Sequence, residues 1–358
     1  MKPEHKKTAL IVGVTGIVGR NLAELLSSKN DWDVIGLARR PLEIAGVKRQ
    51  IAADLLDREA AIKALRGANP THVFYCTWSR RETEAQNCEV NGQMLRNLLD
   101  AVTGSSALQH VTLVTGLKHY LGSFENYGSG RAETPFREDE PRQPGLNFYY
   151  VQEDILFEEA AKHHFSWNVQ RPHTIIGYAL GNVMNMGVTL AAYGSLCRMF
   201  KRPFVFPGSL RQYESPTDVT DASLLAKHLL WAATTESAKN EAFNVVNGEI
   251  FRWRWLWPKL AQFFEIEAIG YPGQKRPLEQ QMSNAATEWK LLAEKYSLRN
   301  AKVEELASWW HTDADLGREI ECFTDMTKSR ELGFLEYKST LRSFLELFER
   351  LRADRIIP

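Results

Sequence analysis

The sequence predicts an α/β fold built on a doubly wound parallel sheet, with a smaller and mostly helical C-terminal part. Two observations lead to this prediction. Short apolar runs typical of buried strands alternate with helical patterns along the first two thirds of the chain. A chain of 358 residues can also bury a core large enough for one such domain and an appended part. We expect residues 1–179, with 215–248 returning to them, to form the sheet domain, and 180–358 mainly the appended part.

The expected elements follow one another with short turns between them. The candidate strands are residues 8–13, 33–38, 48–53, 71–76, 109–115, 167–171 and 242–247. The candidate helices are residues 17–28, 58–66, 84–103, 149–164 and 221–234. The turn Gly67-Ala68-Asn69-Pro70 is typical of the connections. This order predicts parallel strands with helices on both faces of the sheet.

Composition argues against several classes of protein. The 44 Lys and Arg balance the 44 Asp and Glu, and the chain has no basic block of the kind that binds nucleic acid. No stretch approaches the ~20 apolar residues that span a bilayer, and the first residues contain no apolar signal region. The four cysteines have neither disulfide-framework nor metal-ligand spacing: Cys76, Cys88, Cys197 and Cys322. We expect a cytoplasmic protein without a metal, a nucleic-acid partner or a membrane partner, and either a monomer or a homodimer.

A glycine-rich turn joins the first strand to the first helix, over residues 13–19 (Gly-Val-Thr-Gly-Ile-Val-Gly). Gly13 allows the turn, Gly16 lets a pyrophosphate approach the backbone, and Gly19 lets the helix pack closely on the strand. The helix N-terminus attracts the anion. This strand–turn–helix context predicts a Rossmann-type dinucleotide site. The cofactor contacts expected here are Gly13, Thr15, Gly16, Ile17, Val18 and Gly19.

The end of the second strand indicates which dinucleotide binds. It reads Ala38-Arg39-Arg40, where an NAD enzyme usually places an acidic residue for the ribose hydroxyls. Guanidinium groups bind phosphate through paired, charge-assisted hydrogen bonds, so the two arginines favour NADP(H). A solvated basic turn before Pro41 is the alternative interpretation.

The third strand is followed by Ala53-Asp54-Leu55. Asp54 is placed to meet the adenine amino group, and we expect Leu55 to contact the cofactor beside it. A helix cap is an equally good interpretation of Asp54.

Two further motifs point to the chemistry. Residues 115–120 (Thr-Gly-Leu-Lys-His-Tyr) follow the fifth strand, and residues 147–154 (Asn-Phe-Tyr-Tyr-Val-Gln-Glu-Asp) begin a helix. Extended short-chain dehydrogenases carry Ser or Thr at that strand end and Tyr-x-x-x-Lys on that helix. Here Gly116 falls near the serine position, and Glu153 and Asp154 stand four residues past the two tyrosines.

This departure removes the lysine that usually lowers the pKa of the tyrosine. Glu153 would raise the pKa of Tyr149 instead. Lys118, after the neighbouring strand, can supply the missing positive charge from another direction. A solvated loop lysine is the alternative interpretation of Lys118. We expect Lys118 to be partly exposed. Its substitution by methionine should therefore change the folding stability only weakly.

These motifs resemble those of the progesterone 5β-reductase/iridoid synthase family, enone reductases of the short-chain dehydrogenase/reductase superfamily. The matching motifs are residues 13–19, 38–40, 115–120 and 147–150 with Glu153-Asp154, and further likeness occurs at 72–78, 170–172 and 329–334. The resemblance implies NADPH-dependent 1,4-reduction of α,β-unsaturated ketones or aldehydes, with Tyr149 and Lys118 as catalytic residues. The further cofactor contacts implied are Thr77, Thr115, Gly116, Tyr149 and Ile176.

The adjacent tyrosines compete for the catalytic role. Residues 149 and 150 point ~100° apart around a helix, so only one can face the nicotinamide. The resemblance favours Tyr149 over Tyr150. A ring packed under the sheet with its hydroxyl satisfied is the alternative for either.

The substrate pocket is expected to involve several apolar residues. Trp78 follows the fourth strand, at the carboxyl edge where ligands of open parallel sheets bind. Phe124 and Tyr127 lie in the long loop 119–146, at positions that match the family's pocket, and long loops are commonly functional. Met186 begins a Met- and Leu-rich helix that is expected to form a wall.

The tryptophans Trp253 and Trp257 are spaced as on one helix face, and we expect them to pack in the core of the appended part. Two other functions stay open on the sequence. One is a sugar-nucleotide epimerase or dehydratase, or a carbonyl reductase, of the same superfamily; the other is a non-enzymatic NADP-binding sensor. The absent Tyr-x-x-x-Lys lysine counts against the epimerase, and Lys118 with Tyr149 counts against the sensor.

Overall fold

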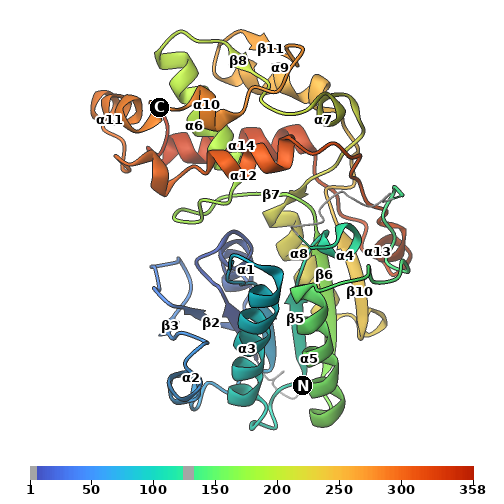
Figure 1. Ribbon diagram of the computed structural model, residues 1–358. Coiled ribbons are helices and arrows are strands. Elements are labelled where there is room, and N and C mark those ends of the chain that lie inside the picture. The colour runs from blue at the N-terminus through green and yellow to red at the C-terminus, as the bar shows by residue number, and fades with distance from the viewer. Residues whose placement is uncertain (1–5, 124–132) are drawn as a thin grey trace.

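The computed structural model describes residues 6–123 and 133–358, and its centre is a seven-stranded parallel sheet (Figure 1). The strand order is β10-β6-β5-β4-β1-β2-β3. The strands are β1 (Lys7–Val12), β2 (Trp32–Ala38), β3 (Arg49–Ala52), β4 (His72–Tyr75), β5 (His110–Val114), β6 (Ser166–Pro172) and β10 (Glu241–Val245). The order reverses between β1 and β4, and in sheets of this kind the crevice at such a reversal is where ligands bind.

Helices cover both faces of the sheet because both faces of its strands are apolar. Along β1, Leu10 and Val12 pack with one cluster, and Ala9 and Ile11 pack with the other. The helices of the first face are α2 (Arg58–Leu65), α3 (Glu84–Val102) and α5 (Phe148–His163). Those of the second are α1 (Ile17–Ser27) and α8 (Ala222–Thr234). The predicted doubly wound α/β fold is therefore confirmed.

The expected strands and helices all form, with ends no more than two residues from the predicted ones. The largest difference is at β10, which ends at Val245 rather than at residue 247. Asn247 instead donates its backbone N–H to the Val219 carbonyl outside the sheet. The helix caps Asn147 and Asp221 explain why α5 and α8 begin where they do.

The C-terminal part lies beyond the carboxyl ends of the strands and is mostly helical (Figure 1). Its helices are α6 (Met186–Met199), α7 (Leu210–Glu214), α9 (Trp253–Phe263), α10 (Leu278–Gln281), α11 (Ala285–Tyr296), α12 (Trp309–Leu316) and α14 (Thr340–Ala353). The short helix α13 (Thr327–Glu331) instead lies beside β10. Two short parallel pairs accompany them: β7 (Ile175–Ile176) with β9 (Thr220–Asp221), and β8 (Phe204–Val205) with β11 (Ala268–Ile269). One further turn of helix, α4 (Lys118–Leu121), follows β5.

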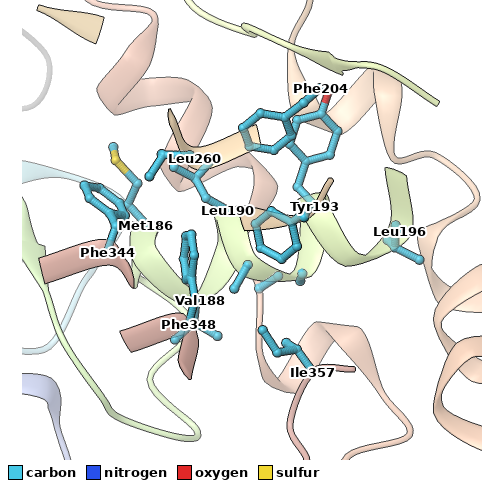
Figure 2. Packing of buried hydrophobic residues seen from close by; sticks show 14 of the residues in the cluster. Met186, Val188, Leu190, Tyr193, Leu196, Phe204, Leu260, Phe344, Phe348 and Ile357 are labelled. Atoms are coloured by element: carbon cyan, nitrogen blue, oxygen red, sulfur yellow. The ribbon is translucent and has the colours of Figure 1, made fainter. Parts of the chain in front are cut away.

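Helix α6 is the centre of the C-terminal core and is buried over most of its length. Figure 2 shows its side chains between residues of α9 and α14, with Phe344 and Phe348 on one side and Phe204 on another. Trp253 and Trp257 are both buried in this cluster, and the Trp257 indole donates to the Phe204 carbonyl at 2.8 Å. The prediction of core packing for these tryptophans is confirmed. Among the described residues, no helix has the length and apolar character needed to cross a membrane.

Candidate active site

The glycine turn after β1 is packed so closely that side chains are excluded. Gly13 has a positive φ of 81°, and a Cβ there would lie 2.8 Å from the Cys76 carbonyl oxygen and from the Thr77 Cβ. A Cβ at Gly19 would collide with the Gly13 carbonyl. Gly16 has more room: a Cβ there would come no nearer than 3.3 Å to the Gly13 carbonyl oxygen. Helix α1 begins after Gly16 without a side-chain cap, so its first N–H groups suit an anion.

The end of β2 lies against this turn. The Leu37 carbonyl accepts hydrogen bonds from the Gly13 and Val14 N–H groups at 2.8 and 3.2 Å. Ala38 is buried, whereas Arg39 and Arg40 are exposed and form no ion pair within the part of the chain that the structure describes. The residues present therefore fit a dinucleotide: a backbone cradle for the pyrophosphate and two uncommitted guanidinium groups beside it.

The helix-cap interpretation of Asp54 is wrong. The cap of α2 is Asp57, whose side chain accepts from the Ala60 N–H at 3.0 Å. Asp54 accepts from the Leu56 N–H at 3.0 Å within the preceding turn and is exposed. Leu55 is buried in the hydrophobic core on one face of the sheet.

Asn147 joins the two motifs that the sequence analysis singled out. It caps α5 by accepting from the Tyr149 N–H at 3.1 Å, and its side-chain amide donates to the Lys118 carbonyl at 2.8 Å. Lys118 is the first residue of α4. The cap that starts the tyrosine helix thus also fixes where Lys118 sits.

Lys118 is buried in an ion pair with Glu84, the first residue of α3. The ammonium lies 2.7 Å from both carboxylate oxygens, and only 4% and 3% of the two side chains are exposed. The expectation of a partly exposed lysine is therefore wrong. Sequence reasoning also missed Glu84, because a glutamate at a helix start has an ordinary local explanation.

The two tyrosines occupy different surroundings. The Tyr150 hydroxyl donates to the His119 carbonyl at 2.6 Å and accepts from the Gln143 N–H at 2.8 Å, so it is tied to the backbone. The Tyr149 hydroxyl lies over Gly116, where a Cβ would be 3.3 Å from its oxygen. A serine at position 116 would crowd this hydroxyl. The geometry supports Tyr149 as the residue that faces a ligand.

Glu153, four residues past Tyr149, lies beside two arginines. Its carboxylate is buried and lies 2.9 Å from the Arg142 guanidinium and 3.7 Å from that of Arg171. Burial raises the pKa of Glu153, and the two arginines oppose that shift. Burial also raises the pKa of Tyr150, and the charge of Glu153 adds to that rise. The acid therefore belongs to the surroundings of Tyr150.

The remaining predicted residues of the sheet edge lie around the same point. The Trp78 ring stacks on the ring of Phe148, the residue before Tyr149. The two centroids lie 5.4 Å apart and the planes meet at 18°. Thr77 contacts the Gly13 turn, as the close approach of its Cβ shows. Thr115 is buried, and its hydroxyl donates to the Gln170 carbonyl at 3.2 Å. The carboxyl ends of β4 and β5 thus bring the glycine turn, Trp78 and the tyrosine helix together.

The family follows from comparison with known proteins. Residues 10–358 match the model of the PRISE-like Rossmann-fold domain. The chain belongs to this family. Two predictions from the motifs are thereby confirmed: the family, and that the protein is an oxidoreductase.

Two relatives of this PRISE-like protein are similar to it along nearly their whole length. A 3-oxo-Δ(4,5)-steroid 5β-reductase of Arabidopsis thaliana is 41% identical, with 99% of this chain and 94% of the relative covered. An (S)-8-oxocitronellyl enol synthase of Nepeta racemosa is 40% identical over the same shares of the two chains.

Solved structures with lower identity share the fold of the PRISE-like chain. A UDP-glucose 4-epimerase of Thermotoga maritima superposes with a TM-score of 0.66 at 15% identity, covering 97% of this chain and 99% of that one. An enzyme named RMD, from Pseudomonas aeruginosa and complexed with NADPH, gives 0.65 at 14% identity, covering 96% and 99%. At these identities the likeness shows the Rossmann-type fold alone.

Of the other predicted residues of the PRISE-like site, two are buried in the C-terminal core and two are not described. Ile176 and Met186 are both buried in the C-terminal core, so only the backbone of Ile176 remains for a cofactor contact. Met186 nevertheless also lines a small cavity with His173 and Arg318. Phe124 and Tyr127 lie outside the described residues.

A polar cluster lines that cavity, and no sequence motif predicted it. His173 directly follows Pro172, whose carbonyl lies beside Gly116. Its Nδ1 is 2.7 Å from Asp218, and its Nε2 accepts from the Arg318 guanidinium at 2.8 Å. An arginine can only donate, so this contact needs an unprotonated Nε2. Against that and against the effect of burial, Cys322 and Asp218 raise the pKa of His173 from about 6.5 to about 9. Within the described residues, no group of three or more His, Cys, Asp or Glu is arranged to hold a metal ion.

Proposed function

We propose that this PRISE-like protein is an NADPH-dependent reductase of activated C=C bonds, which acts on α,β-unsaturated ketones or aldehydes by 1,4-reduction. The observation that carries the proposal is the pairing of Tyr149 with Lys118 through Asn147 at the carboxyl end of β5. The helix has Glu153 where an ordinary short-chain dehydrogenase has its lysine, and Gly116 stands near the serine position. The names of the two relatives, a steroid reductase and an enol synthase, agree with this chemistry.

The chain divides the work between its two parts in this proposal. Residues 1–179, with 215–248, hold NADP(H), and 180–358 mainly cover the substrate. The glycine turn would hold the pyrophosphate, and Arg39 with Arg40 would hold the 2′-phosphate. Bound NADPH supplies the hydride for the β-carbon of the substrate.

The protein itself stabilises the negative charge that develops on the substrate carbonyl oxygen. Tyr149 donates a hydrogen bond to that oxygen, and Gly116 has no side chain to crowd the hydroxyl. Trp78 and Phe148 provide an apolar wall, which strengthens such a hydrogen bond by excluding water. A proton from the tyrosine or from solvent then completes reduction at the α-carbon.

The decisive test exchanges the hydroxyl of each tyrosine for hydrogen. Tyr149→Phe should lower kcat for enone reduction ~10²- to 10³-fold with unchanged NADPH affinity, as for loss of one donor to a developing oxyanion. Tyr150→Phe is the matched control. It should largely keep kcat but lose ~1–3 kcal/mol of folding stability, because the His119 carbonyl and the Gln143 N–H lose their partner.

The readout is steady-state NADPH oxidation against cyclic and acyclic enones, with saturated ketones and sugar nucleotides in the same panel. Turnover of enones but not of saturated ketones supports 1,4-reduction. The reverse ranking of the two variants would transfer the catalytic role to Tyr150. Turnover of sugar nucleotides alone would make the protein an epimerase-type enzyme, and tight NADP binding without any turnover would make it a sensor.

A further inference from the structure

Glu84 contacts three segments of the site at once. Its carboxylate lies 2.7 Å from the Lys118 ammonium through both oxygens. One oxygen also accepts from the Phe148 N–H at 2.9 Å, and the other accepts from the Asn87 side chain at 3.3 Å. Phe148 is the first residue of α5 and directly precedes Tyr149. A single carboxylate thus links α3, α4 and the tyrosine helix.

The local structure of α3 does not account for this orientation. Thr83 already caps the helix, and it forms a reciprocal capping box with Gln86. Acidic side chains in a first helical turn are usually exposed and interact with the helix dipole. Glu84 is instead buried, as is Lys118. Its carboxylate therefore serves the site rather than the start of the helix.

The ion pair determines whether the buried Lys118 side chain stays protonated. A buried ammonium without a counter-charge loses its proton more readily, since burial favours the neutral form. The Phe148 ring, 4.6 Å from the ammonium, offers weaker compensation. Among the described residues, the Cys88 thiol also lies close enough to interact with both charges of the pair. Burial raises the pKa of the Cys88 thiol, the charge of Glu84 adds to this, and Lys118 opposes it.

We propose that Glu84 is a positioning residue of the reductase, which keeps Lys118 protonated and holds Lys118 and the first turn of α5 in one frame around Tyr149. This inference rests on the proposed function. It also changes the role of Lys118. The lysine and the carboxylate form a neutral pair, so Lys118 orients the site and does not simply add a positive charge to it.

The test is Glu84→Gln, which keeps the shape and an oxygen for the Phe148 N–H but removes the charge. It should lower kcat ~10-fold or more and move the basic limb of the kcat profile to lower pH by ~1 unit or more, with NADPH affinity unchanged. Glu89→Gln, at an exposed position of the same helix, is the matched control and should leave the profile unchanged. A purely structural role for Glu84 would lower the folded fraction without moving the basic limb.

The double variant Glu84→Gln/Lys118→Met removes both charges and guards against loss of folding in the single variant. If Glu84 acts through Lys118, the double variant should have the same kcat as Lys118→Met. Independent, multiplying losses overturn the proposal, and so does a Glu84→Gln profile that matches wild type. Failure of the proposed function looks different: the wild-type protein itself would then reduce no enone on the panel.

Discussion

Lys118→Met is the substitution for which the structure reverses the expectation drawn from sequence. Methionine keeps the apolar stem of the lysine and removes the ammonium. The Glu84 carboxylate, 3% exposed, then stays buried without its cation. Removing one partner of a buried ion pair costs ~3–5 kcal/mol. Glu84 keeps its bonds from the Phe148 N–H and the Asn87 amide, so we expect the low end, ~3 kcal/mol.

Thermal and urea unfolding measure this loss. An unfolding entropy of ~2.1 cal/mol/K per residue corresponds to ~0.75 kcal/mol/K for this chain, so ~3 kcal/mol lowers Tm by ~4 °C. In urea, the midpoint should fall with an unchanged slope, since the folded and unfolded states expose the same surface as before.

Two further variants make the result specific to the pair. Lys118→Met/Glu84→Gln should recover most of the lost stability, because neither charge is then left buried alone. Lys63→Met, at an exposed position of α2, should change stability by less than ~0.5 kcal/mol. On this scale a loss of ~1 kcal/mol lowers Tm by ~1.3 °C. A Lys118→Met protein whose Tm lies within ~1 °C of the wild-type value would therefore refute the reasoning from the buried pair.

Two other predictions concern the cofactor and pH. Arg39→Asp should weaken NADPH binding ~10-fold or more, because a charge-assisted phosphate contact is lost, and should leave NADH binding nearly unchanged. Calorimetry measures both affinities. Equal affinities of the wild-type protein for NADPH and NADH would contradict the proposal that the two arginines select NADP(H). His228 is buried against the rings of Trp231, Phe243 and Phe334, and burial lowers its pKa from about 6.5 to about 3. The folded protein therefore favours neutral His228, whose contribution to stability is complete above pH ~6.5 and is lost as pH falls towards 3, by up to ~1.4 kcal/mol per unit. His228→Asn should reduce the slope of unfolding free energy against pH between 4 and 6 by up to one proton; an unchanged slope would show that His228 is not buried in its neutral form.

The sequence by itself determined the sheet, its helices and the glycine turn. These features depend on residues close together in the chain: apolar runs of strand length, helical periodicity, and the glycines at 13, 16 and 19. The family motifs also placed Lys118 and Tyr149 among the candidate residues. Local patterns carry this information because strands and helices form from neighbouring residues and then bury the faces that those patterns define.

Only the tertiary structure decided which side chains meet. The sequence left Tyr149 and Tyr150 open, and the bonds of the Tyr150 hydroxyl to His119 and Gln143 separate their surroundings. Glu84 lies 34 positions before Lys118, and no periodicity connects them. Their pairing depends on how α3, α4 and α5 pack at the carboxyl edge of the sheet. Because a charge is stable in the interior only beside its partner, the packing that buries Lys118 is also what makes Glu84 part of the site.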